Sequence, residues 1–195
     1  MPSLVIDAVR CVEETDESGS DDVYIIIFRG DPKPPFGSNV GVHGPGWNFN
    51  EGEFTPGLNW MDFDSGELWN PDVPIAMYFP DAVYMIMLVE EDNSRDISGA
   101  EILGAWRSQC GLVWRGALLP LQLSGQLPAP PAKLTTAAQT VGQTMLGLAS
   151  LYMEFPKGND DVIGKPQQVV ISPGQTPTLH FKGDGGYYRI RFKIV

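Results

Sequence analysis

The chain of 195 residues is 43% hydrophobic and 19% charged, a composition typical of a single folded domain whose core needs neither disulfides nor a metal. Its 24 acidic residues outnumber its 13 basic residues, and the net charge is −11. Because nucleic-acid binding requires a basic face, this balance argues against a nucleic-acid partner and favours the binding of cations.

The first part of the chain predicts two strands joined by an acidic loop. Residues 3–10, SLVIDAVR, partly alternate apolar and polar side chains, and residues 23–28, VYIIIF, form a β-branched and aromatic run. Both are typical of strands, and the second predicts burial on both faces. Between them lies the carboxylate-rich stretch EETDESGSDD. The first residues do not predict a signal peptide, because they lack a basic start and a long apolar run.

The middle of the chain predicts short strands and a second acidic loop. Residues 30–69 are rich in glycine, proline and asparagine, which argues against long regular elements. PIAMYF (74–79) and AVYMIMLVE (82–90) are apolar enough to predict two strands. EDNSRDISGAE (91–101) then predicts an acidic loop, and LVWRGALLPLQL (112–123) predicts one or two further strands.

A stretch of different character follows the proline-rich connector LPAPPAK (127–133). Residues 134–153 contain no charged side chain, and their apolar residues recur at spacings of three and four: Leu134, Ala138, Val141, Met145, Leu148 and Tyr152. This is the helical period, and it predicts a helix packed on the strands. Glycine and glutamine in the stretch argue against a membrane span, and insertion into a bilayer as part of a secreted, pore-forming (toxin-like) assembly is the alternative.

The last part of the chain predicts strands in QQVVIS (167–172), TPTLHF (176–181) and YYRIRFKIV (187–195). The final segment alternates, so that apolar residues lie on one face and Arg189, Arg191 and Lys193 on the other. This is the pattern of a half-buried antiparallel strand. Together the segments predict an all-β fold, an antiparallel β-sandwich of about eight strands with one inserted helix near residues 134–152.

Three acidic segments make a calcium site the leading functional hypothesis. Calcium binds about six to eight oxygen ligands, and carboxylates from loops at one end of a sheet can converge on it. Crowded carboxylates repel one another, and a divalent cation removes that cost. The competing interpretation is that each loop is simply solvated. The residues that we expect to bind calcium are Asp16, Asp21, Asp22, Glu90, Asp92, Asp96, Glu101, Asp160 and Asp161.

The stretch LVIDAVRCVEETDESGSDDVY (4–24) resembles the opening of the calcium-dependent phospholipid-binding domain, or C-two domain, of synaptotagmins and protein kinase C. The resemblance implies that Asp16 and Asp22 are ligands in the first calcium loop of that family. It also implies that bound calcium connects the protein to phospholipid headgroups, which suits a chain too acidic to bind anionic membranes unaided.

Two segments resemble the third calcium loop of the same family. YMIMLVEEDNSRDISGAEILG (84–104) matches a strand followed by spaced acidic residues, which implies ligand roles for Glu90, Asp92 and Glu101. NDDVIG (159–164) resembles the end of that loop. Both assignments remain open, and the partner that calcium engages is expected to be membrane lipid or another protein.

Other functions remain as alternatives. Trp60 and Trp69, within NWMDFDSGELW (59–69), are candidates for stacking on sugars in a calcium-stabilised carbohydrate-binding module. No enzyme is expected, because the GxSxG elbow is absent and the two histidines lie far apart in the sequence. Cys11 and Cys110, both in predicted strands, are interpreted as two buried thiols, with a single disulfide as the alternative.

Overall fold

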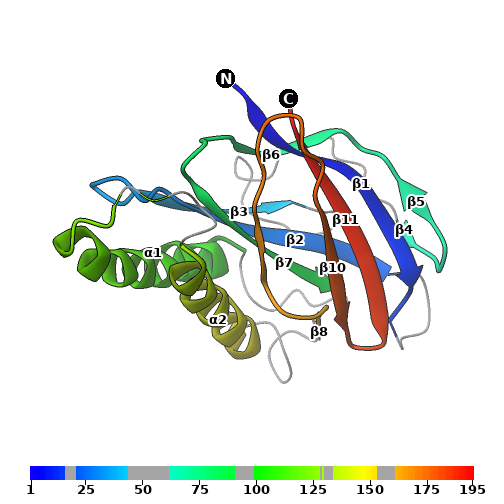
Figure 1. Ribbon diagram of the computed structural model, residues 1–195. Helices are drawn as coiled ribbons and strands as arrows, with labels where there is room; N and C mark the ends of the chain where they lie inside the picture. Colours follow the sequence, from blue (N-terminus) through cyan, green and yellow to red (C-terminus); the bar gives the residue numbers. More distant parts are fainter. Residues whose placement is uncertain (16–20, 44–61, 91–98, 128, 130–133, 153–160) are drawn as a thin grey trace.

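The computed structural model describes residues 1–15, 21–43, 62–90, 99–127, 129, 134–152 and 161–195, which form two antiparallel sheets and two helices (Figure 1). The elements in chain order are β1 (Ser3–Glu13), β2 (Asp21–Gly30), β3 (Ser38–His43), β4 (Asp62–Phe63), β5 (Leu68–Trp69), β6 (Val73–Met77), β7 (Val83–Glu90), α1 (Gly99–Leu123), α2 (Thr135–Tyr152), β8 (Asp161–Val162), β9 (Gln167–Val169), β10 (Thr178–Gly183) and β11 (Gly186–Ile194).

The strands are divided between a five-stranded and a six-stranded sheet. The first has the order β10-β11-β1-β5, with β6 also paired to β1. The second has the order β3-β2-β7-β8, with β4 paired to β2 and β9 to β7. The predicted β-rich, antiparallel fold is therefore confirmed. The described residues form eleven strands, more than the roughly eight that were predicted. The difference arises because β4, β5, β8 and β9 have only two or three residues each, too few to show a side-chain pattern in the sequence.

β2 and β7 are the central strands and are buried on both faces. They pair without interruption from Val23 and Glu90 to Gly30 and Val83. Alternate side chains of the two strands enter different clusters of buried residues, one between the two sheets and the other against the helices. The two-sided burial predicted for residues 23–28 is thus confirmed.

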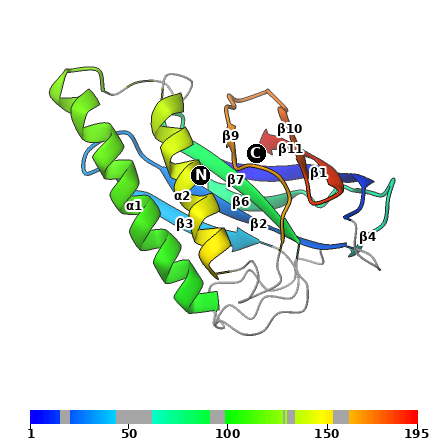
Figure 2. The same cartoon turned by 90° about the horizontal axis from the view of Figure 1, so that it is seen from below.

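The helices and the five-stranded sheet cover opposite faces of the six-stranded sheet. Figure 2 shows α1 and α2 side by side on one face, with β1 and β11 beyond the other face. The buried side chains of α1 and α2 form one cluster with Tyr24, Ile26 and Phe28 of β2. Val23 and Ile25 belong instead to the cluster that β2 shares with β1, β10 and β11.

The prediction of strands over residues 112–123 is wrong, because these residues are the second half of α1. The buried side chains of α1 recur every three or four positions, as on one face of a helix: Leu103, Trp106, Cys110, Trp114 and Leu118. This period shows only in a window that begins well before residue 112. The described residues consequently form two helices instead of the single predicted one.

Trp114 packs α1 against the end of β2. Its ring packs edge-to-face on Phe28 with ring centroids 5.7 Å apart, and its Nε1 donates a 3.0 Å hydrogen bond to the carbonyl oxygen of Asp31. Gly30 makes this approach possible, because a Cβ there would lie 2.5 Å from Cε2 of the indole. The N–H group of a buried tryptophan usually has such a hydrogen-bond partner, and here the contact orients as well as anchors the helix.

α2 confirms the helix predicted from the uncharged stretch. Ala138, Val141 and Met145 are fully buried on the face that packs against β7 and α1. Within the described residues, no helix combines the length and hydropathy that crossing a bilayer requires.

Both cysteines are buried thiols that form no disulfide in the described structure, as interpreted from the sequence. Cys11 lies on β1 in the cluster between the sheets, whereas Cys110 lies in the cluster under the helices. The placement of Cys110 in a strand is wrong, since it belongs to α1. Burial raises the pKa of the Cys110 thiol to about 12, which keeps it protonated at neutral pH.

Candidate functional site

The six-stranded sheet brings three acidic segments together at one end. Val23, which follows Asp22, lies opposite Glu90, and Glu90 lies opposite Asp161. Asp22 itself lies opposite Asp62 on β4. Paired strands are about 4.8 Å apart, so four acidic residues from four strands occupy neighbouring backbone positions, with the Glu90 and Asp161 positions on the sheet face of Val23 and the Asp22 and Asp62 positions on the opposite face. Figure 2 shows that α1 begins and α2 ends on this side of the molecule.

Several of the predicted ligands lie in regular elements and not in loops, which corrects the sequence interpretation. Asp21 and Asp22 are the first residues of β2, because pairing with β4 extends that strand beyond the apolar run. Asp161 begins β8, and Glu101 lies in the first turn of α1, which starts at Gly99. The remaining predicted ligands, Asp16, Asp92, Asp96 and Asp160, lie outside the described residues.

Glu90 is the most buried of the predicted ligands whose side chains are described. It is 4% exposed, whereas Asp161 is half-buried. A buried carboxylate is costly unless hydrogen bonds or a cation compensate the lost hydration. Among the side chains that the structure describes, no group of three or more His, Cys, Asp or Glu residues could hold a metal. Those of Asp21, Asp22 and Glu101 are not part of that set.

Trp69, the described member of the candidate sugar-stacking pair, contributes to the core. It is half-buried and packs against the cluster between the sheets. Its ring lies edge-to-face against Phe63, with ring centroids 6.5 Å apart. Trp60 lies outside the described residues.

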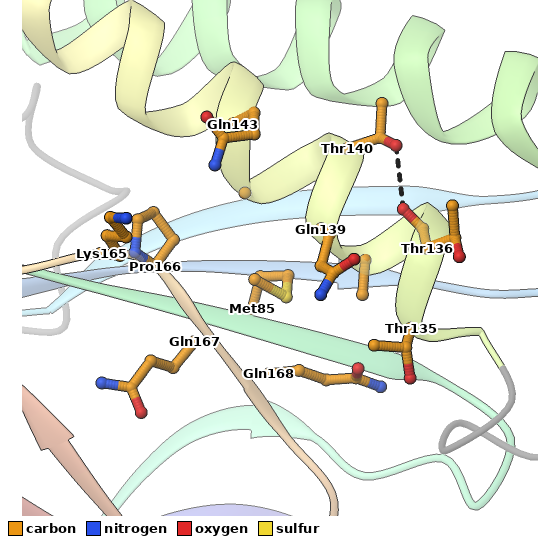
Figure 3. Close-up of a pocket in the computed structure, with 12 residues that line it drawn as sticks. Met85, Thr135, Thr136, Gln139, Thr140, Gln143, Lys165, Pro166, Gln167 and Gln168 are labelled. Atoms are coloured by element: carbon orange, nitrogen blue, oxygen red, sulfur yellow. Dashed lines mark hydrogen bonds between the residues drawn. The ribbon is translucent and has the colours of Figure 1, made fainter.

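A groove of about 710 Å³ lies between α2 and the segment that leads into β9 (Figure 3). This side of the groove consists of residues 165–168, of which the last two belong to β9, and the side chain of Met85 from β7 lies between the two walls. The α2 side of the groove consists of Thr135, Thr136, Ala138, Gln139, Thr140, Gly142 and Gln143. The groove has the size of a site for a small organic molecule.

The groove is lined mostly by polar residue types and is almost uncharged. The Thr140 hydroxyl donates a 2.9 Å hydrogen bond to the carbonyl oxygen of Thr136, one turn earlier in α2. On the opposite wall, the side-chain amide of Gln167 donates to the carbonyl oxygen of His180, which ties β9 to β10. Lys165 is the one charged residue among the described residues that line the groove.

Gly142 allows α2 to lie close to both neighbouring segments. A Cβ at this position would lie 2.9 Å from Cε of Met85 and 3.5 Å from Cβ of Pro166. A side chain at this position would require the flexible end of Met85 to move, so Gly142 leaves room for that methionine against α2.

No sequence pattern predicts this groove. The feature of the sequence that could have indicated it is the lack of charged residues over 134–153. Burial explains that lack on the buried face of the helix but not on its exposed face.

A scan against models of known protein families matches none of them, and a search of curated proteins finds no significantly similar sequence.

Proposed function

We propose that this protein is a calcium-binding β-sandwich module, similar to the C-two domain, which docks on anionic membrane lipid when calcium is bound and has no catalytic activity. The observation that supports the proposal is the strand register that brings Asp22, Glu90 and Asp161 to one end of the six-stranded sheet.

Electrostatics favours a cation at this end of the sheet. Two cross-strand pairs there consist of like charges, Asp22 with Asp62 at positions of one face and Glu90 with Asp161 at positions of the other, so each pair offers a cation its own two carboxylates. Like charges at directly opposite positions destabilise a sheet. Calcium prefers carboxylate and carbonyl oxygens and tolerates irregular geometry, so it offsets this repulsion without requiring one fixed ligand arrangement.

The charge of the chain explains why docking would depend on the metal. At a net charge of −11, the protein is repelled by anionic lipid headgroups. Calcium bound at the acidic end neutralises part of that charge and offers open coordination positions to phosphate or carboxylate groups of the headgroups.

Calcium is expected to raise the melting temperature of the protein. A ligand that binds only the folded state at about 100 times its Kd adds about 2.7 kcal/mol of stability. For a chain of this size that corresponds to a rise of roughly 5–10 °C. The measurement is a thermal melt with and without calcium, with a chelator added to reverse the effect.

Variants locate the site. Asp22→Asn and Asp161→Asn should each reduce the calcium-dependent rise while leaving the metal-free melt unchanged or higher, because each removes one crowded negative charge. Asp81→Asn is the matched control, since Asp81 precedes β7 at its opposite end and pairs with Lys33. A calcium-dependent rise that survives in both site variants contradicts the assignment.

Vesicles test the docking step. Co-sedimentation with phosphatidylserine vesicles should require calcium and should be weaker for Asp22→Asn than for Asp81→Asn. If the melt responds to calcium but the vesicles do not, the protein binds the metal and the lipid part of the proposal is wrong.

A further inference from the structure

We propose that the groove between α2 and residues 165–168 binds a saccharide that carries a carboxylate, such as a uronic acid. This site is separate from the acidic end of the sheet and does not depend on calcium. Four features of the groove support the proposal: the uncharged face of α2, the two glutamines on it, the apolar floor and the position of Lys165.

The exposed face of α2 differs from that of an ordinary surface helix. Thr135, Thr136, Gln139, Thr140 and Gln143 are exposed, yet the 18 residues of the helix include no charged side chain. Surface helices normally carry Lys, Arg, Glu and Asp on their exposed face. Neutral hydroxyl and amide groups instead complement the hydroxyl groups of a polar, uncharged ligand body, which each donate and accept a hydrogen bond.

Gln139 and Gln143 provide the principal hydrogen-bonding groups. They are one helical turn apart and therefore on the same side of α2. Both line the groove, and neither side chain makes a hydrogen bond to another described residue. Each amide offers two donors on nitrogen and one acceptor oxygen, so the pair can engage adjacent hydroxyls of one sugar ring.

The floor of the groove is apolar and closely covered. Met85 is 2% exposed and Ala138 is fully buried, so a ligand contacts the floor only when the flexible end of Met85 moves. The C–H face of a sugar ring is apolar, and a polarizable methionine side chain adapts to such a surface. The combination of an apolar floor with polar walls is typical of small-molecule sites.

Lys165 gives the groove its preference for an acid. No described carboxylate lies among the lining residues, and Lys165 makes no ion pair within the part of the chain that the structure describes. The net charge of −11 would otherwise repel an anionic sugar. Figure 3 places Lys165 beside Pro166 on the wall opposite Gln143, so a carboxylate near Lys165 leaves the ring hydroxyls facing α2.

The test uses D-galacturonate and its uncharged counterpart D-galactose, titrated by NMR in the presence of a calcium chelator. Galacturonate should bind about ten times more tightly than galactose, the gain expected of one charge-assisted hydrogen bond. Because calcium is absent, the outcome is independent of the proposed calcium function.

Two variants distinguish the contribution of the Lys165 charge to sugar affinity from that of the glutamine amides. Lys165→Gln should remove the preference for galacturonate but retain weak binding of both sugars, whereas Gln139→Leu should weaken both sugars equally. Lys33→Gln, which alters a lysine paired with Asp81 away from the groove, should leave both affinities unchanged. Circular dichroism confirms that each variant is folded.

Three results would overturn the proposal: galacturonate binding no more tightly than galactose, acetate competing as well as galacturonate, or Lys33→Gln reducing the preference as much as Lys165→Gln does. The second result would show that Lys165 attracts any carboxylate and that the groove contributes no sugar recognition.

Discussion

At the scale of single residues, two glycines allow the segment after β8, in one sheet, to contact β10 in the other sheet. Gly164 has a φ of +77°, and a Cβ on it would lie 2.7 Å from the carbonyl oxygen of Lys182. A Cβ on Gly183 would lie 2.4 Å from the backbone nitrogen of Gly164. The segment after β8 therefore touches β10 backbone to backbone, and from there it continues into the wall of the groove.

Replacing Gly164 by alanine should destabilise the fold by roughly 2–4 kcal/mol, because left-handed backbone strain adds to a steric overlap with Lys182. Gly174→Ala is the matched control, since its φ is +83° but a Cβ there meets nothing within 4 Å. The control should lose only about 1–2 kcal/mol of strain energy. The free energy of unfolding in urea distinguishes the two, and equal losses would contradict the argument.

At the scale of elements, β1 shows how one extra residue changes the face that a strand buries. Ile6 pairs with Phe192 and Ala8 with Arg191, so Asp7 forms a bulge between them. Before the bulge, even-numbered residues such as Ile6 enter the cluster between the sheets, and after it odd-numbered residues such as Val9 do so. The bulge explains why residues 3–10 alternate only in part.

The bulge also places a carboxylate among cations. Asp7 accepts hydrogen bonds from Arg191 and, at 2.8 Å, from the ammonium group of Lys193. Lys193 also bonds to Asp72 at 2.5 Å. The hydrogen bond from Lys193 is the largest effect that holds the pKa of Asp7 below its usual value; burial opposes it and Arg191 reinforces it.

This lowered pKa predicts a pH-dependent effect of Asp7→Asn. A carboxyl group whose pKa is lower in the folded state contributes stability above its unfolded pKa of about 3.9, and loses that contribution as pH falls through the folded value. The variant should therefore be less stable than the parent at neutral pH, by up to roughly 1 kcal/mol for a partly exposed pair. The difference should shrink in urea unfolding below about pH 4.

The charge control for this prediction is Asp184→Asn. Asp184 lies at the tip of the β10–β11 hairpin with a φ of 48°, a conformation that asparagine also tolerates. A stability difference between Asp7→Asn and the parent that stays constant down to the lowest pH would contradict the linkage argument.

At the scale of the whole molecule, both clusters of buried residues depend on the same two strands. Leu88 of β7 faces the five-stranded sheet, and its neighbour Met87 faces the helices. Exposing the cluster on one face of the six-stranded sheet would disrupt β2 and β7, and the cluster on the other face depends on the same two strands. We therefore expect the helices and both sheets to unfold in one cooperative transition.

Core truncations on the two sides test this cooperativity. Leu88→Ala and Met87→Ala should each cost about 2–5 kcal/mol and accelerate global amide exchange equally in peptides from α2 and from β11. If Met87→Ala accelerates exchange in α2 alone, the helical layer unfolds separately and the prediction is wrong.

Sequence patterns predict a helix or strand correctly where its buried side chains follow a period that is visible within one short window. The runs around β2 and β7, the alternation of β11 and the helical spacing of α2 are each visible within one window, and the structure confirms them. α1 was missed because apolar residues 112–114 and 117–119 resemble short strands when its first half is left out of the window. The groove was missed because its walls come from α2 and from residues more than 20 positions later.

The sequence alone determined which segments carry acidic charge, which strands have two apolar faces and which stretch is a helix without charge. The tertiary structure alone decided that Asp22, Glu90 and Asp161 share one end of a sheet. The physical reason is that side-chain periodicity depends on neighbouring residues, whereas strand order depends on how the whole chain buries its apolar faces. That burial brings together residues that are far apart in the sequence.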